Sequence, residues 1–357
     1  MPDTGPHPPP TSPIEHPTSP DDGAANAAAP AAERPRSIGL VLGAGGVAGY
    51  AFHTGVLAAL QDAGWDARTA ELIVGTSAGA GAASLLRAGL SPADHYAHTL
   101  GRPLSAHAEA LVARLPAGAW DSGELADPAL PLPAAVPTAL RGLLRWPPRP
   151  GLTVAGALPR GRRSAGPMQR RHEAVHDSWP DAALWVCAVR LRDGRRVVFG
   201  RDDHPPLGVG EAVAASSAIP GVFSPVGVGG EDYVDGGVWS MTNADLTRGL
   251  GYDAVVVSAP LAGPEDWRNM GRRPSPGAAY RAYHLAVLAA ETRRIRDAGT
   301  PVLALRPTPA DAAAFRTGGG GVDRPSVAEQ AYRSVTERLE ADPALLAQLV
   351  EPVAVHP

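Results

Sequence analysis

The residues that could do chemistry begin with a serine held between two glycines. Residues 75–79 read Gly-Thr-Ser-Ala-Gly, directly after the apolar run Glu71–Val74, and small residues of helical character follow. This order predicts a sharp strand-to-helix turn with Ser77 at its apex, a nucleophile elbow flanked by glycine because little else fits there. Such a turn exposes the serine hydroxyl and points the next helix N-terminus at an anion forming beside it. The pattern predicts a nucleophile, although the pentapeptide also occurs by chance in glycine-rich chains.

A second glycine cluster, Gly43–Gly49, lies between the apolar run Ile38–Leu42 and a helical pattern. A tight loop of this kind exposes several backbone N–H groups, which together can cradle an anion. One candidate anion is the diphosphate of a dinucleotide, because residues 43–48 match the fingerprint G-x-G-x-x-G/A. The other is the oxyanion of a tetrahedral acyl intermediate at Ser77. The second strand does not end in the acidic residue that a dinucleotide site needs, so the sequence favours the oxyanion.

A serine nucleophile needs a base, and Asp235 is the best candidate. It follows the short apolar pair Tyr233–Val234 and precedes two glycines, which permit close approach of another chain segment. A carboxylate serves as a base when desolvation raises its proton affinity. The alternative is an ordinary turn carboxylate. A triad would use His284, but this residue falls within a helical pattern, where a structural histidine is more common; His53 is expected in packing or on the polar surface.

Apolar runs alternate with helical patterns from Ser37 onward. Two strand–glycine loop–helix units in succession predict parallel strands with helices packed on the sheet. Further strands are expected at Leu184–Leu191 and Arg196–Phe199 as a hairpin, and at Val222–Val226, Tyr233–Val234, Asp253–Ser258 and Pro301–Leu305. Further helices are expected at residues 208–217, 278–297 and 326–340.

Composition excludes several classes of protein. The net charge of −4 argues against a general nucleic-acid binder. No stretch approaches the length of a membrane-spanning helix, and the N-terminus lacks the features of a secretion signal. The single cysteine, Cys187, excludes an intramolecular disulfide and a cysteine metal cluster, which fits a cytoplasmic location. His95, His98 and His107 lack metal-ligand spacing, so we expect no metal and no cofactor.

Three parts are expected along the chain. Residues 1–36, rich in proline and alanine, predict a disordered tail because they cannot bury enough apolar surface to become ordered. Residues 37–310 are expected to form the catalytic domain, with residues 101–180 as a cap or insertion. Residues 311–357 are expected to hold a glycine-rich break and a helix.

The expected insertion carries an unusual charge pattern. Between Pro128 and His172 there are arginines but no acidic residues, and leucines and Trp146 are interleaved with the first of them. One hypothesis is that this Arg-rich region, residues 140–171, makes peripheral contact with an anionic membrane. The alternative is an irregular insertion with solvated arginines. The eight arginines are Arg141, Arg145, Arg149, Arg160, Arg162, Arg163, Arg170 and Arg171.

Taken in order, these motifs resemble the patatin-like phospholipases. The resemblance rests on the glycine loop at 43–49, the elbow at 75–79, the stretch 215–223 and the Asp-Gly-Gly at 235–237, and it extends over about residues 37–306. It implies an α/β fold, a three-layer α/β/α sandwich with a mainly parallel central sheet. It also implies metal-independent hydrolysis of lipid acyl esters by a Ser–Asp dyad rather than a triad.

Carried over by position, the resemblance implies that Ser77 is the nucleophile and Asp235 the base. The oxyanion hole would consist of main-chain amides, those of Gly43, Gly45 and Gly46, with the amide of Ala78 as a further donor by the general logic of the elbow. Ala48 departs from the family, many of whose members have arginine or lysine there. The loop therefore lacks a cation that could attract an anionic headgroup, and a neutral glyceride or simple ester is a credible substrate.

The expected function is a serine lipid acyl hydrolase of the phospholipase A, lysophospholipase or carboxylesterase type. Its partner is a lipid or acyl-ester substrate, with no nucleic acid, and its expected location is cytoplasmic or peripheral at a membrane. Two alternatives stay open. One is a dinucleotide-binding oxidoreductase that uses the Gly43–Gly49 loop, and the other is a non-catalytic, lipid-binding protein of patatin fold.

Overall fold

One sheet of eight strands runs through the part of the chain that the computed structural model describes, residues 33–116, 125–126, 132–146, 149–202, 206–263, 276–315 and 321–354. Its strands lie in the spatial order β6 (Val226–Val228), β7 (Glu231–Asp235), β4 (Ala183–Arg190), β3 (Leu72–Gly75), β2 (Ile38–Leu42), β8 (Ala254–Ser258) and β9 (Val302–Leu305), with β5 (Arg195–Phe199) paired to β4. The five strands from β4 to β9 are parallel, and β5, β6 and β7 are antiparallel to their neighbours. The mainly parallel sheet expected from the sequence is confirmed.

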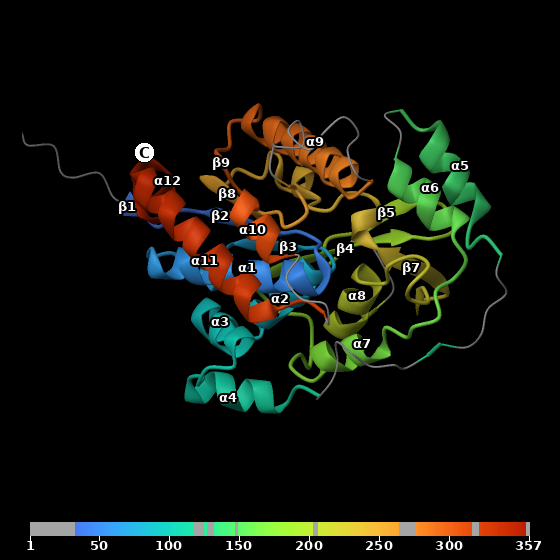
Figure 1. Cartoon of the computed structure of the whole chain (residues 1–357), viewed down its shortest axis with the longest axis horizontal. Coiled ribbons are helices and arrows are strands. Elements are labelled where there is room, and N and C mark those ends of the chain that lie inside the picture. The colour runs from blue at the N-terminus through green and yellow to red at the C-terminus, as the bar shows by residue number, and fades with distance from the viewer. Residues whose placement is uncertain are drawn as a thin grey trace, which may run out of the picture.

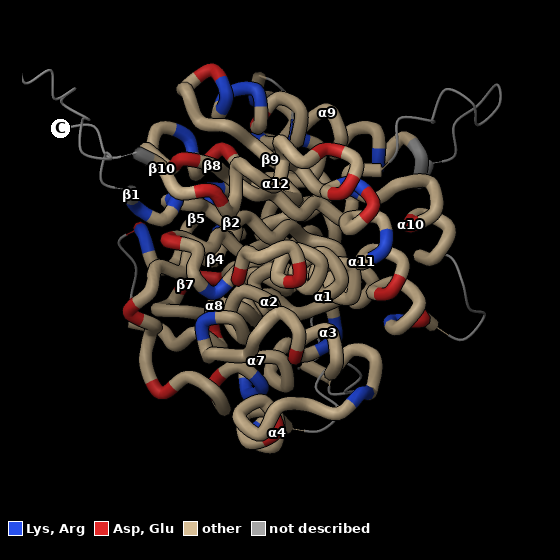
Figure 2. The backbone as a smooth tube through the Cα atoms, turned by 90° about the vertical axis from the view of Figure 1, so that its left-hand side faces the viewer, with Lys and Arg blue, Asp and Glu red and all other residues tan. Residues whose placement is uncertain are grey.

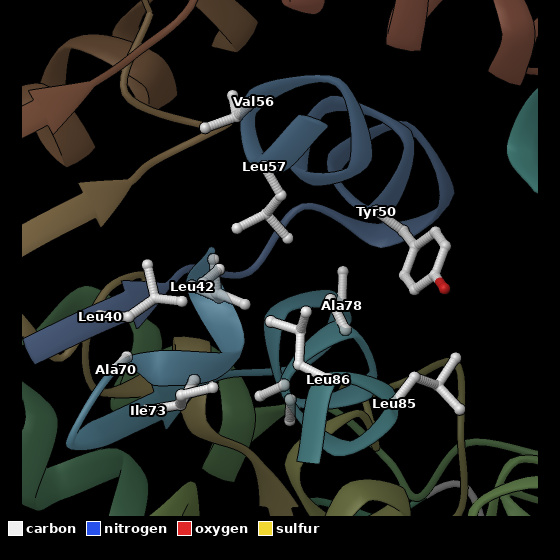
Figure 3. Packing of buried hydrophobic residues seen from close by; sticks show 14 of the residues in the cluster. Leu40, Leu42, Tyr50, Val56, Leu57, Ala70, Ile73, Ala78, Leu85 and Leu86 are labelled. Carbon is white, nitrogen blue, oxygen red and sulfur yellow. The ribbon is translucent and has the colours of Figure 1, made fainter. Parts of the chain in front are cut away.

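Helices cover both faces of this sheet, which gives three layers (Figure 1). Successive residues of a strand point to opposite faces. Leu40 and Leu42 of β2 therefore pack beneath α1 (Gly46–Asp62) and α2 (Ala78–Arg87), as Figure 3 shows, whereas Val41 packs on the side of α9 (Pro276–Arg296). The expected α/β/α sandwich is confirmed.

The remaining helices lie around these layers. They are η1 (Ala67–Thr69), α3 (Pro92–Leu100), α4 (Ala106–Ala113), α5 (Val136–Leu144), α6 (Pro150–Ala157), α7 (Gly166–Glu173), α8 (Val209–Ser216), η2 (Gly236–Val238), η3 (Ala244–Thr247), α10 (Pro309–Ala314), α11 (Arg324–Ala341) and α12 (Pro343–Val350). In Figure 2 most charged residues lie at the periphery, around a centre made of other residue types. Among the described helices, none has both the length and the apolar character that crossing a bilayer requires.

The expected insertion is divided between two places in the fold. Helix α4 lies beyond α3, and α7 packs against α8, whereas α5 and α6 pack against each other as a helical hairpin at the far end of the sheet (Figure 1). The described part of residues 101–180 thus forms no single layer over the sheet, and the domain boundaries stay predictions.

Both ends of the chain differ in part from expectation. Glu33–Arg34, placed in the tail by the sequence, form β1, which pairs with β10 (Val353–Ala354); residues 1–32 lie outside the described residues. The break expected at Gly318–Gly321 falls almost wholly outside them as well. The strand expected at Val222–Val226 is wrong, because the chain turns there, with the Val222 N–H donating to the Ile219 carbonyl, and β6 begins only at Val226.

The C-terminal helix α11 is part of the main core rather than an appendage. Val327, Ala328 and Ala331 pack in the same cluster as α1. The two helices approach so closely at Gly55 that a Cβ there would lie 2.1 Å from the Ala328 carbonyl oxygen. A glycine is required at this crossing because both close neighbours are backbone atoms.

Replacing Gly55 with alanine tests this packing. Alanine has the higher helix propensity, yet we expect Gly55→Ala to lower the free energy of unfolding by about 1–3 kcal/mol, because the helices must separate. Urea denaturation measures the change. Gly227→Ala is the control, since a Cβ there meets nothing within 4 Å, and equal stabilities for the two variants would contradict this account of α1 and α11.

Candidate active site

Ser77 stands where β3 ends and α2 begins, at the carboxyl edge of the parallel strands. Its φ of 53° and ψ of −119° put a non-glycine residue in the positive-φ region, which is a sparsely populated conformation. The residue is buried, with 5% of its surface exposed. The chain therefore adopts the strained strand-to-helix turn that the sequence predicts for residues 75–79.

The two glycines of this turn are required by close contacts rather than by φ. A Cβ on Gly75 would lie 2.6 Å from the Ala80 Cα, and a Cβ on Gly79 would lie 2.0 Å from the Leu42 carbonyl oxygen. The second contact presses the start of α2 against the end of β2. Elbow and glycine loop, which follow β3 and β2, are thus brought side by side.

Sheet register brings Asp235 level with Ser77. Gly75 of β3 pairs with Val186 of β4, and Asp235 at the end of β7 pairs with Ala188, two residues farther along β4. The serine and the aspartate thus meet at the same edge of the sheet, with β4 between their strands. The Asp235 carboxylate accepts a hydrogen bond from the Gly237 N–H at 2.7 Å, and the Ser77 hydroxyl lies close enough to it to lower the pKa of the carboxyl group.

Burial changes the acidity of Asp235. Only 5% of the residue is exposed, and this desolvation raises the pKa of its carboxyl group from 3.8 to about 6; the Gly237 N–H and the Ser77 hydroxyl oppose the rise. A carboxylate with a raised pKa accepts a proton more readily than an ordinary aspartate. Asp235 is thus mainly ionised at neutral pH and is more basic than an ordinary aspartate, and its role as the base stays a prediction.

The glycine loop presents main-chain amides beside the serine, but not all of those proposed from the sequence. The Gly43 N–H donates to the Ser258 carbonyl at 3.0 Å, so its assignment to the oxyanion hole is corrected. The N–H groups of Gly45, Gly46 and Ala78 take part in no hydrogen bond between described residues. Gly46 and Ala78 are the first residues of α1 and α2, where N–H groups have no intrahelical partner.

His53 holds this loop from beneath, a role that the sequence did not reveal. It is fully buried, with Nε2 2.7 Å from the Gly43 carbonyl oxygen and Nδ1 2.8 Å from the Ser258 hydroxyl. Because a carbonyl can only accept, Nε2 carries the proton and Ser258 donates to Nδ1. Burial lowers the pKa of His53 to about 4, so the ring is neutral at pH 7.

Ser216 holds the elbow from the other side. Its hydroxyl accepts from the Ser77 N–H at 2.9 Å and donates to the Cys187 carbonyl of β4 at 2.6 Å. It comes from α8, in the stretch 215–223 that carried part of the family resemblance. The signal for its position was therefore present in the sequence, but its role depends on contacts that a motif does not specify.

A further polar network fixes the residue before the nucleophile. The Asn243 side-chain amide donates to the Thr76 hydroxyl at 3.1 Å and to the Ser240 carbonyl at 2.7 Å. Its oxygen accepts from Arg196, which also forms an ion pair with Asp245. Asn243 has a φ of 53°, a conformation that asparagine tolerates better than most residues. The elbow is thus bound to two segments distant in the sequence.

A cavity of about 540 Å³ opens at Ser77 and Asp235. Its wall is mainly apolar apart from the glycine loop and the side chains of Ser77, Asp235 and His284. The lining residues come from α6, from the turn after α8, from the segments that follow β7 and β8, and from α9, and they include Pro150, Val154, Ala155, Ile219, Pro220, Val238, Trp239, Met241, Leu261, Tyr280 and Tyr283. Such a cavity suits a hydrophobic chain placed next to the hydroxyl.

His284 also lines this cavity, but it does not complete a triad. Neither of its ring nitrogens has a hydrogen-bond partner among the described residues, so it is not linked to Asp235. Tyr280 and Tyr283 contact its ring edge to face, at centroid distances of 4.3 and 5.0 Å. Burial lowers the pKa of His284 to about 4. The described histidines, acids and cysteine form no group of three that could hold a metal ion.

Replacing Ser216 with alanine tests its role in holding the elbow. The change removes the acceptor of the Ser77 N–H and the donor to the Cys187 carbonyl, both buried. We expect the free energy of unfolding to fall by about 1–3 kcal/mol, measured by urea denaturation. Ser217→Ala is the matched control, because this neighbouring serine is also buried, with 5% of its surface exposed, and its hydroxyl has no hydrogen bond to a described residue. A loss of the same size in both variants would count against the assigned role.

Comparison with known proteins gives this geometry a family. The family model described as patatin-like phospholipase matches residues 40–248, which is more than half of the chain and includes the glycine loop, the elbow and Asp235. No curated protein matches.

Solved structures are more distant. The crystal structure of VipD from Legionella pneumophila is 14% identical, with a TM-score of 0.40 over 87% of this chain and 68% of VipD. That of the type III effector protein ExoU is 18% identical, with a TM-score of 0.35 over 90% of this chain and 55% of ExoU, so the chain covers little more than half of that protein. At these values the two structures add no argument about function. The family match does: this chain belongs to the patatin-like phospholipase family.

Proposed function

We propose that this protein is a serine lipid acyl hydrolase of the phospholipase A, lysophospholipase or carboxylesterase type. The observation that supports it best is the close approach of the Ser77 hydroxyl to the buried Asp235 carboxylate in the wall of one mainly apolar cavity. Membership of the patatin-like phospholipase family supports a lipid substrate. The structure describes no second base in contact with this pair.

In the proposed first step, Asp235 accepts the proton of Ser77 while Oγ attacks the acyl carbonyl carbon. The carbonyl π electrons move to oxygen, which becomes an oxyanion next to the N–H groups of Gly45, Gly46 and Ala78. Aimed donors of this kind stabilise the developing charge without reorganising. Collapse of the intermediate expels the alcohol, which takes the proton from Asp235, and leaves an acyl-serine.

In the second step the same groups act on water. Asp235 accepts a proton from a water molecule while the water oxygen attacks the carbonyl carbon of the acyl-serine. The same amides stabilise the second oxyanion. Collapse then releases the fatty acid, and the proton returns to Ser77. The acyl chain would occupy the apolar wall formed by residues such as Val154, Val238 and Leu261.

The structure weakens the role that the sequence gave to arginine in membrane contact. Arg141 and Arg149 donate to main-chain carbonyls, Arg160 forms an ion pair with Asp232, and Arg171 is buried. These arginines are therefore engaged in contacts within the protein. Peripheral contact with a membrane remains part of the proposal, and a cytoplasmic location stays a prediction.

The two alternatives make different predictions. A dinucleotide-binding oxidoreductase would be stabilised by NAD, whereas the family match gives that hypothesis no support. A non-catalytic lipid-binding protein would bind lipid without hydrolysing it. Labelling of Ser77 by a fluorophosphonate would separate the proposed function from both.

Removing either reactive side chain tests the proposed dyad. We expect Ser77→Ala and Asp235→Asn each to lower kcat/KM for p-nitrophenyl butyrate by about a thousandfold or more, since each removes a participant in the chemical step. Far-UV circular dichroism and thermal unfolding should show folded proteins. Ser217→Ala, a buried serine of the same site region without a hydrogen bond to a described residue, is the activity control. Full activity in either dyad variant would refute the assignment.

The pKa of Asp235 predicts a pH dependence. The base must be ionised, so kcat/KM is expected to fall as the pH drops through about 6, well above the ordinary aspartate value of 3.8. The free energy of unfolding should change in the opposite direction and rise as the pH falls from about 6 to about 4. Because the folded-state pKa is raised, ionisation between about pH 4 and 6 costs folding free energy as the pH rises.

Asp235→Asn should therefore raise the Tm at pH 7 relative to the wild type, and this difference should vanish below about pH 4. Differential scanning calorimetry across this range measures it. If the activity of the wild type has its pH midpoint near 4, or if the variant has a lower Tm than the wild type at pH 7, burial does not raise the pKa of the Asp235 carboxyl group.

A further inference from the structure

Helix α5 has its polarity reversed relative to an ordinary surface helix. Its buried positions are Thr138 and Gly142, a small polar residue and a glycine. Its large apolar residues point outward: Leu140 is 51%, Leu143 64% and Leu144 79% exposed. A helix on the surface of a globular protein normally turns its apolar stripe inward.

The orientation of α5 is fixed by close packing, so this exposure is not an accident of a loose helix. A Cβ on Gly142 would lie 2.4 Å from the Thr153 N of α6, and one on Gly156 of α6 would lie 2.4 Å from the Ala139 N of α5. The Thr138 hydroxyl donates to the Leu191 carbonyl at 2.5 Å. The helix cannot rotate its leucines inward without breaking these contacts.

The apolar surface continues past the end of α5. Trp146, two residues beyond the helix, is 89% exposed, and Val136 at its start is 54% exposed. We name Val136, Leu140, Leu143, Leu144 and Trp146 the apolar ridge. Exposed apolar surface of this kind marks an interaction site more often than an accident of sequence.

The helix that bears the ridge packs against a helix that lines the cavity. Helix α6, which packs against α5, contributes Val154, a residue that both lines the cavity and is 52% exposed. Ile219, Tyr280 and Tyr283 also line the cavity and are 36–46% exposed. An acyl chain at this surface could thus reach Ser77 along apolar side chains.

The charges beside the ridge do not point to an anionic partner. Arg141 donates to the Asp193 carbonyl, and the guanidinium groups of Arg145 and Arg149 lie 4.8 and 4.6 Å from the Trp239 ring centroid. These cations are held against the body of the protein. The sequence has no acidic side chain from residue 128 to 172, so no carboxylate of this segment repels lipid phosphates.

We propose that the apolar ridge docks the protein onto a lipid–water interface by inserting its leucines and Trp146 among the acyl chains. Leucine and tryptophan are the residues that anchor peripheral helices at this depth. Docking would place the cavity mouth at the membrane, so that a lipid moves from the bilayer to Ser77 without crossing water. This inference rests on the proposed function in so far as the substrate is a lipid. Binding depends on the apolar side chains and needs no anionic headgroup.

The test measures vesicle binding separately from hydrolysis. Ser77→Ala is used as the background, so that the vesicles stay intact, and binding is measured by flotation with phosphatidylcholine vesicles, with and without phosphatidylglycerol. Leu143→Ser/Leu144→Ser removes two exposed leucines. We expect this double variant to partition at least tenfold more weakly into both kinds of vesicle, because each inserted leucine contributes substantially to transfer. Leu250→Ser, at an exposed leucine elsewhere, is the matched control and should bind normally.

In the active protein, Leu143→Ser/Leu144→Ser should leave hydrolysis of water-soluble p-nitrophenyl acetate unaltered. It should lower hydrolysis of vesicle lipid at least tenfold. A wild type that binds vesicles but hydrolyses neither ester would refute the proposed function and leave the docking surface standing. Brominated phosphatidylcholine adds a direct readout, since it should quench the fluorescence of the wild type more than that of Trp146→Phe.

Three results would overturn the docking proposal. The first is unchanged vesicle binding by the double leucine variant. The second is binding that requires phosphatidylglycerol and is lost in Arg141→Ala, which would assign the contact to charge. The third is a dimer in the absence of lipid that dissociates when the leucines are replaced, which would assign the ridge to a second copy of the chain.

Discussion

The rest of the structure depends on one contact, the close approach of a hydroxyl and a carboxylate that are both buried and come from two different strands. Ser77 follows β3 and Asp235 ends β7, with β4 between them, so the contact exists only while both pairings with β4 keep their register. Burying the carboxylate costs free energy, because its charged form loses solvation. That same cost raises the pKa of Asp235 and gives the group its basicity.

Buried polar groups hold the two sides of this contact in place. Ser216 connects the elbow to β4, Asn243 connects Thr76 to the segment after β7, and His53 holds the carbonyl of Gly43. Each group is satisfied, which matters because an unpaired polar atom in such a core is expensive. A neutral histidine suits its place, because it donates to a carbonyl and accepts from a hydroxyl without the cost of burying a charge.

The apolar cavity and the outward-facing helix α5 belong to one surface. The apolar surroundings that raise the pKa of Asp235 also favour binding of a hydrocarbon chain in the cavity. Helix α6 contributes apolar surface both to the cavity wall and to the outside of the protein. The cavity and helix α5 thus both expose apolar side chains, which the surface of a water-soluble protein usually buries. This shared character fits a substrate that is itself an assembled lipid.

The sequence by itself determined most of the elements and the identity of Ser77 and Asp235 as candidates, because apolar periodicity and glycines at sharp turns are local signals. It could not determine which amides stay unpaired: Gly43 donates to Ser258, more than two hundred residues away. It also missed the roles of His53 and Ser216, and it left open whether the arginines meet a membrane or solvent, where several contact the protein itself. These features follow from which distant residues meet, and only the tertiary structure decides that.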